Sequence, residues 1–124
     1  MKDLNIASSK TIPQVNFNSE FGELSISGRS LPEQAHELFK PMLDWIDGYS
    51  KEAKAVTTIN ITLEYINSSS NKYLLLVLKK LEELYVAEHS VVVNWYYEEY
   101  DEDAMESGEE YRDLLNVPVN ILKV

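Results

Sequence analysis

The chain contains no cysteine, which removes several kinds of chemistry at once. Without thiols it has no disulfides, no thiolate metal ligands and no cysteine nucleophile. A protein of a reducing compartment shows this composition, and we expect a cytoplasmic protein. The two histidines, His36 and His89, lie far apart in the sequence with no carboxylate at ligand spacing. We therefore predict that both are surface side chains and that the protein holds no metal.

Glycine and basic residues are also scarce. The four glycines are scattered, so the sequence has neither a phosphate-cradling loop nor a dinucleotide-binding fingerprint, and we expect no cofactor. The 11 basic residues are outnumbered by 21 acidic ones, which gives a formal charge of −10. Nucleic acids and anionic membranes are bound through clustered Lys and Arg, so both partners are disfavoured. No stretch reaches the roughly 18 apolar residues of a membrane span, and the N-terminus lacks the apolar core of a signal peptide.

The length and the alternation of apolar residues indicate one domain built on a sheet. A chain of 124 residues can bury a real core, and we expect residues 1–124 to form a single domain. Period-two patterns predict a short strand around Leu4 and then a hairpin whose third strand is closed by Gly28. They also predict a central strand from Val56 to Tyr65, with Tyr65 on the buried face.

Three segments have the period of a helix, and two further strands follow the central one. The first helix is predicted to begin with Ser30 as its cap and to kink at Pro41. The second spans Ser68 to about Val86, and the third begins with Asp103 as its cap. The strand at residues 90–97 is expected to be covered on both faces, and residues 119–124 form a short final strand. The pattern predicts an α/β fold, with a mixed sheet, an N-terminal hairpin and three to four helices packed on it.

The polar stretch from Asn67 to Lys72 lies at the junction between the predicted central strand and the predicted second helix. A helix start presents backbone N–H groups without intrahelical partners, and the aligned peptide dipoles place partial positive charge there. The three consecutive serines and the flanking asparagines suit a capped helix with a polar turn. The same chemistry would also stabilise an anion at this position. Both interpretations are open on residue chemistry alone.

The acidic run at residues 98–103 is the other candidate site. It does not match a calcium-binding loop, because Met105 stands at the fifth position and no glycine follows at the sixth. Carboxylates also belong in the first turn of a helix for dipole reasons, so we expect a solvated helix entry or a partner-facing patch. A small metal-dependent enzyme built on this cluster is the less favoured alternative. The neighbouring Tyr96 is a candidate for the same partner surface.

Three segments that occur in this order resemble the SiaC family. They are residues 26–30 with Pro32 and Glu33, residues 63–72, and residues 93–99 with their acidic continuation. The likeness covers nearly the whole chain. The SiaC family is similar in fold to anti-sigma-factor antagonists of the STAS type, so the resemblance implies a STAS-like sandwich. It also implies a regulatory protein that switches partners when phosphorylated, not an enzyme.

The resemblance further implies the partners and the modified residue. A serine/threonine kinase phosphorylates the hydroxyl that follows the asparagine of the turn, and a PP2C-type phosphatase reverses this. The unphosphorylated protein binds and activates a diguanylate cyclase, which links the switch to cyclic-di-GMP and biofilm control. Carried onto this sequence, the acceptor is Ser68, where a known member of the family has threonine; Ser69 is the less favoured acceptor. An alternative is an anti-sigma-factor antagonist-like switch that acts on an anti-sigma kinase. The expected partner contacts are Asn67, Ser69, Ser70, Asn71, Lys72, Tyr96, Glu98 and Glu99.

Overall fold

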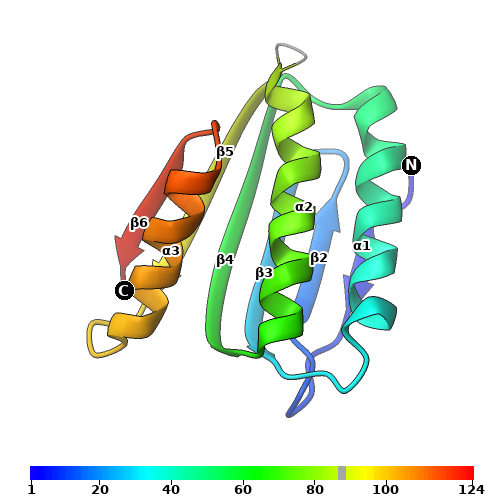
Figure 1. Ribbon diagram of the computed structural model, residues 1–124. Coiled ribbons are helices and arrows are strands. Elements are labelled where there is room, and N and C mark those ends of the chain that lie inside the picture. The colour runs from blue at the N-terminus through cyan, green and yellow to red at the C-terminus, as the bar shows by residue number, and fades with distance from the viewer. Residues whose placement is uncertain (87–88) are drawn as a thin grey trace.

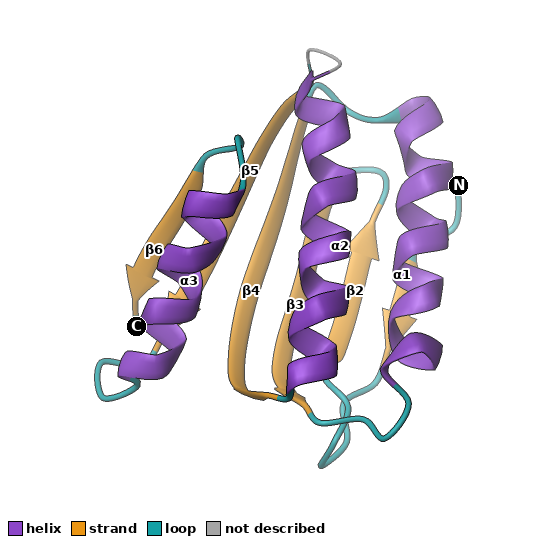
Figure 2. Ribbon diagram, in the orientation of Figure 1, coloured by secondary structure: helices purple, strands orange, loops and turns teal. Residues whose placement is uncertain are grey.

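The computed structural model describes residues 1–86 and 89–124. Within these residues, six strands form one mixed sheet, and three α-helices lie on one of its faces (Figures 1 and 2). In chain order the elements are β1 (Leu4–Ile6), β2 (Gln14–Asn18), β3 (Glu23–Ser30), α1 (Ala35–Tyr49), a 3-10 turn (Ser50–Glu52), β4 (Val56–Ile66), α2 (Ser68–Val86), β5 (Ser90–Tyr97), α3 (Glu102–Leu114) and β6 (Val119–Lys123).

The strands stand side by side in sequence order, from β1 to β6. The first three pair antiparallel and include the predicted hairpin, whereas β3, β4, β5 and β6 run parallel. Each parallel connection contains one helix, and successive crossovers of one hand in one direction place all the helices on the same face. The prediction of a mixed sheet with an N-terminal hairpin and helices packed on it is confirmed.

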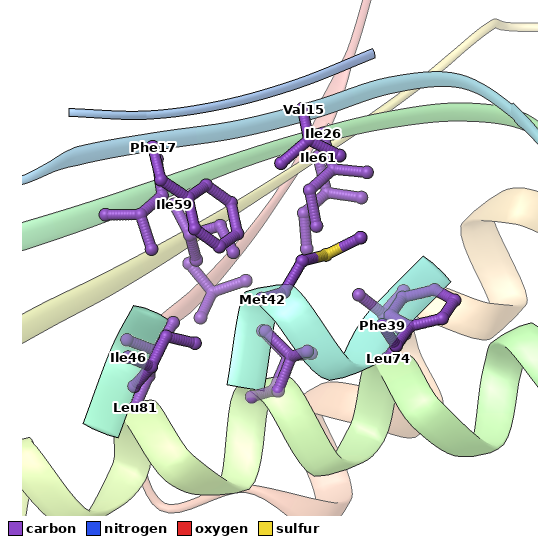
Figure 3. Packing of buried hydrophobic residues seen from close by; sticks show 14 of the residues in the cluster. Val15, Phe17, Ile26, Phe39, Met42, Ile46, Ile59, Ile61, Leu74 and Leu81 are labelled. Carbon is purple, nitrogen blue, oxygen red and sulfur yellow. The ribbon is translucent and has the colours of Figure 1, made fainter. Parts of the chain in front are cut away.

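The core lies between the sheet and the helices. Figure 3 shows Phe17, Ile26 and Ile61 of the strands facing Met42 and other apolar side chains of α1 and α2. On the strands, every second residue points into this layer and is buried, as the period-two patterns predicted. Trp95 of β5 anchors α3, because its indole Nε1 donates to the carbonyl oxygen of Ala104 at 2.8 Å.

The opposite face of the sheet is polar. A row of paired positions crosses the strands there. At its β6 end Asn94 donates to Asn60 Oδ1 at 2.9 Å, and Asn120 donates to Asn94 Oδ1 at 3.0 Å. The prediction that β5 is covered on both faces is wrong, since only Val91, Val93 and Trp95 are buried. The residues of the row are Asn5, Asn16, Ser25, Asn60, Asn94 and Asn120.

The predicted start of the first helix is also wrong. Ser30 is the last residue of β3, and α1 begins only at Ala35, after Gln34. The side chain of Ser30 is fully buried, and its hydroxyl donates a hydrogen bond to Ser70, so it is not available to cap a helix. Gly28 does not close β3: its φ of 108° permits an irregularity in the pairing with β4, after which the strand continues. The helix continues through Pro41 as one uninterrupted element.

Two further positions differ from the prediction. Tyr65 is 57% exposed, because β4 reaches the end of the sheet there and the alternation of buried residues stops after Leu63. The cap of α3 is Asp101, whose side chain accepts from the backbone N–H of Ala104 at 3.0 Å, so Asp103 lies inside the first turn. The predicted bounds of α2 are confirmed.

Candidate functional site

The candidate site is the start of α2, at the end of the sheet where the parallel strands β3, β4 and β5 finish. We call this end the carboxyl edge. Asn67 joins β4 to the helix and caps it, since its Oδ1 accepts from the backbone N–H of Ser70 at 2.9 Å. Its Nδ2 donates to the carbonyl oxygen of Pro32 at 3.1 Å, and its backbone N–H donates to the carbonyl oxygen of Ser30 at 3.0 Å. The turn is therefore fixed to β3 and to the segment that leads into α1.

The three serines of the turn have different surroundings. Ser68 and Ser69 are exposed, and the hydroxyl of Ser69 donates to Asn67 Oδ1 at 3.3 Å. Ser70 is 0% exposed, and it accepts from the equally buried Ser30 hydroxyl at 2.9 Å. Ser70 was predicted to contact a partner, but its burial rules out direct contact. It supports the turn from inside.

The first turn of α2 contains no acidic residue. Because a helix start carries partial positive charge and unpaired N–H groups, a negative group added at this point would be stabilised. The side chain of Lys72 is exposed one turn further on, where it can approach such a group. The turn is thus well capped and also suited to an added anion, so the two interpretations of the sequence are compatible.

Asn71 connects the start of α2 to α3. The hydroxyl of Tyr111, which is only 5% exposed, donates to Asn71 Oδ1. Desolvation by burial, with a smaller effect of the nearby Glu110 carboxylate, raises the pKa of Tyr111 far above its ordinary value of 10.0. The hydroxyl therefore stays protonated and keeps donating. Asn71 is half-buried, so it acts partly as a structural link between the two helices.

The acidic segment lies at the same edge, where β5 passes into α3 (Figure 1). Glu98 and Glu99 are exposed, and Tyr96 is half-buried on the polar face of the sheet. Asp101 is occupied as the cap of α3, and Glu102 and Asp103 occupy its first turn. In the part of the chain that the structure describes, no group of three or more His, Asp or Glu side chains is arranged to hold a metal ion.

A crevice of about 740 Å³ joins the two candidate regions. It lies between β4 and the segment that connects β5 to α3, and Ile66 and Asn71 on either side of Ser68 contribute to its wall. Of the predicted partner contacts, Asn71, Tyr96 and Glu98 also line it, but Glu99 does not. Sequence reasoning missed its other polar and aromatic residues, although a tyrosine at a strand end is a usable signal. Arg29, Tyr65, Tyr97 and Tyr100 are among them.

Fold and site place the chain among small mixed α/β proteins with accessible serines at a capped helix start. The family described as "SiaC family regulatory phosphoprotein" matches residues 6–124, and the chain belongs to this family. The resemblance seen in the sequence is confirmed. The protein is thus a regulatory phosphoprotein by family.

Individual relatives agree over nearly the whole length. The chain is 31% identical over 121 residues to an uncharacterized protein of Pseudomonas aeruginosa strain UCBPP-PA14, covering 98% of this chain and 96% of that protein. It matches the structure of SiaC of Pseudomonas aeruginosa with a TM-score of 0.92 and 29% identity, over 100% of both chains. A further match is the crystal structure of the diguanylate cyclase SiaD in complex with its activator SiaC from the same organism. There the TM-score is 0.93 and the identity 30%, over 98% of this chain and 100% of the other.

Proposed function

We propose that this protein is a partner switch controlled by phosphorylation of Ser68. In the unphosphorylated state it binds and activates a diguanylate cyclase, and phosphorylation releases it. The observation that carries the proposal is an exposed serine hydroxyl at a helix start with no acidic residue in its first turn, in a chain of the SiaC family. The similarity to a SiaC chain that is in complex with a diguanylate cyclase as its activator supports a cyclase as the partner rather than an anti-sigma kinase.

The geometry of the turn favours Ser68 over Ser69 as the acceptor. Both side chains are exposed, but the Ser69 hydroxyl already donates to the capping oxygen of Asn67. Modification of Ser69 would place a phosphate beside that oxygen, where it repels the cap of the helix. A phosphate on Ser68 leaves the bond between Asn67 and the Ser70 N–H in place.

Release follows from charge rather than from refolding. A phosphate adds about −1.5 to −2 charges at neutral pH, and the helix start stabilises them through its dipole and N–H groups. The fold therefore tolerates the modification. A partner that packs on Ser68, Asn67, Ser69 or Lys72 has to desolvate the dianion, which costs more than the lost contacts alone.

The switch requires two further proteins, and no catalytic step by this chain itself. A serine/threonine kinase transfers the phosphoryl group to Ser68, and a PP2C-type phosphatase removes it. Both act on an exposed hydroxyl, which the position of Ser68 supports. We propose that all three partners meet this protein in the cytoplasm. No helix among residues 1–86 and 89–124 is long and apolar enough to cross a membrane.

The proposal is tested by comparing wild type, Ser68→Ala, Ser69→Ala and wild type carrying phosphoserine at position 68. Each is titrated onto a candidate diguanylate cyclase, with binding measured by calorimetry and activity by cyclic-di-GMP formation. Both alanine variants should bind and activate like wild type, whereas the phosphoprotein should lose at least about tenfold in affinity. Equal binding by the phosphoprotein and Ser68→Ala would remove Ser68 from the mechanism.

A further inference from the structure

β4 and β5 pair over only part of their length. Their register runs from Val56↔Ser90 to Thr62↔Tyr96 and ends there, but β4 continues to Ile66 beside β3. At its end β5 pairs only with β6 on its other side, through Tyr97↔Lys123. Figure 2 shows the lower end of β4 turning toward β3 and away from α3. From Leu63 onward, no strand among residues 1–86 and 89–124 pairs with the side of β4 that faces β5.

This separation opens the crevice described above. Its floor is Trp95 and Leu63, both buried, and on the helix side it is backed by the hydrogen bond between Tyr111 and Asn71. The residues from Leu63 to Ile66 form one wall. The pairing of β3 with β4 passes from Gly28↔Leu63 to Arg29↔Tyr65, so Glu64 is an extra residue that makes this edge irregular. At about 3.3 Å per residue the four residues span at most roughly 13 Å, which is enough for a short strand.

The rim of the crevice combines exposed aromatic rings with acidic charge. Tyr65 is 57% exposed and Tyr100 is 83% exposed, although rings of this size usually bury more of their surface. The only cation of the lining, Arg29, lies 5.2 Å from the centre of the Tyr65 ring and 3.4 Å from the carboxylate of Glu64. With Glu64 paired in this way, three carboxylates of the lining stay without a cation in it: Glu98, Asp101 and Asp103.

We propose that this crevice binds an extended, basic segment of a partner protein, which pairs with the free edge of β4. Main-chain hydrogen bonds to Leu63–Ile66 supply the pairing, as in other cases where a peptide adds a strand to an exposed sheet edge. Lys or Arg side chains of the segment face Glu98 and Asp103. Their aliphatic carbons pack against the tyrosine rings, and their charged groups make cation–π contacts with these rings. Ser68 does not itself line the crevice, although its neighbours Ile66 and Asn71 do, and the inference does not rest on phosphorylation of Ser68.

The experiment uses the unmodified full chain, labelled with ¹⁵N, and a blocked heptapeptide that alternates lysine and valine. The peptide should bind saturably and shift the amide signals of Leu63–Ile66 and of Tyr97, while the same peptide with glutamate for lysine should not. Glu98→Lys should weaken binding roughly tenfold through charge reversal. Glu99→Lys is the matched control, and Glu98→Gln with Glu99→Gln forms a second pair, because Glu99 lies 3.6 Å from Lys123 Nζ and a lysine there would add a repulsive contact. Glu99 is also exposed but does not line the crevice, so Glu99→Lys and Glu99→Gln should each change the affinity less than about twofold, whereas Glu98→Gln should weaken it.

Strand pairing is tested by methylating backbone nitrogens of the peptide. Alternate residues of an added strand point their N–H groups toward the edge they join, so methylation of one alternating set should abolish binding and methylation of the other should not. Equal binding by both methylated peptides would overturn the inference, because it would mean that the peptide is attracted by its positive charge without pairing as a strand. The inference is also wrong if no saturable binding occurs or if Glu99→Lys weakens binding as much as Glu98→Lys. None of these outcomes bears on Ser68, since no phosphate and no cyclase are present.

Discussion

The starts of α2 and α3 lie at the same edge of the sheet, and an Asn or Asp side chain caps each of them. Asn67 Oδ1 accepts from the Ser70 N–H at 2.9 Å, and Asp101 Oδ1 accepts from the Ala104 N–H at 3.0 Å. Their first turns differ. The first turn of α3 carries two acidic residues, Glu102 and Asp103, whereas that of α2 carries none. One helix start thus holds permanent negative charge, and the other holds hydroxyl groups.

This difference explains where a reversible charge can act. At the start of α3 an added phosphate would meet the carboxylates that already neutralise the helix dipole, and repulsion would oppose it. At the start of α2 the dipole is uncompensated, so a phosphate gains the full interaction and its removal restores the neutral surface. Ser68 therefore lies at the one of these two helix starts whose charge can be changed without breaking its cap.

The largest expected effect comes from removing the two caps in turn. Asn67→Ala should lower the free energy of unfolding by about 2 kcal/mol, because it removes the cap and also the bond to Pro32. Asp101→Ala should cost about 1 kcal/mol, because only the bond to Ala104 is lost. Urea unfolding at neutral pH measures both, with circular dichroism to verify the fold. If Asp101→Ala lowers the free energy of unfolding as much as Asn67→Ala does, the hydrogen bond from Asn67 to Pro32 contributes nothing to stability.

A smaller effect is expected where Tyr111 ties the two helix regions together. At neutral pH Tyr111→Phe should cost about 1 kcal/mol, since the Asn71 amide loses its buried donor. Above about pH 10 the difference in unfolding free energy between the wild type and Tyr111→Phe should become smaller. The pKa of Tyr111 is raised in the folded protein, so its contribution is complete below the ordinary pKa of 10.0 and is lost as pH rises toward the folded value.

The pH dependence separates this role from simple packing. In that alkaline range the wild type should lose up to about 1.4 kcal/mol per pH unit from this group, and the variant should not. Urea unfolding of both proteins between pH 7 and 11 provides the comparison. Parallel curves for the two proteins would mean that Tyr111 ionises in the folded state as readily as in the unfolded one.

The sequence predicted the elements well where one local rule decides them. The bounds of α2 follow from an abrupt change of period after an asparagine, and the structure has the same bounds. The cap of α1 was placed at Ser30, four residues before the observed cap Gln34, because Ser30 has the residue type of a cap but is held in β3 by its pairing with Ile66 and by the buried bond to Ser70. Local chemistry cannot show such a bond between residues forty positions apart.

The same limit applies to the candidate site. Ser68 was proposed from sequence because capping and the family resemblance both rest on neighbouring residues, and the structure shows that its side chain is exposed. The crevice was not found, since it depends on where β4 and β5 stop pairing, which no alternation pattern in either strand reveals. The burial of Ser70 was missed for the same reason, because its hydrogen-bond partner Ser30 belongs to β3, forty positions earlier in the chain.

The smallest expected effect tests the charge difference directly. Ser68→Asp places a carboxylate in the uncompensated first turn of α2 and should raise the free energy of unfolding by about 0.5 kcal/mol. Glu102→Gln removes one from the first turn of α3 and should lower it by a similar amount. Both changes should diminish in 1 M salt, because the charges are exposed and screened. Thermal unfolding of the pair at low and high salt measures this, with Ser68→Asn as the uncharged control. A Ser68→Asp protein that is less stable than Ser68→Asn at low salt would show that the start of α2 does not favour negative charge, and the tolerance of a phosphate there would lose its physical basis.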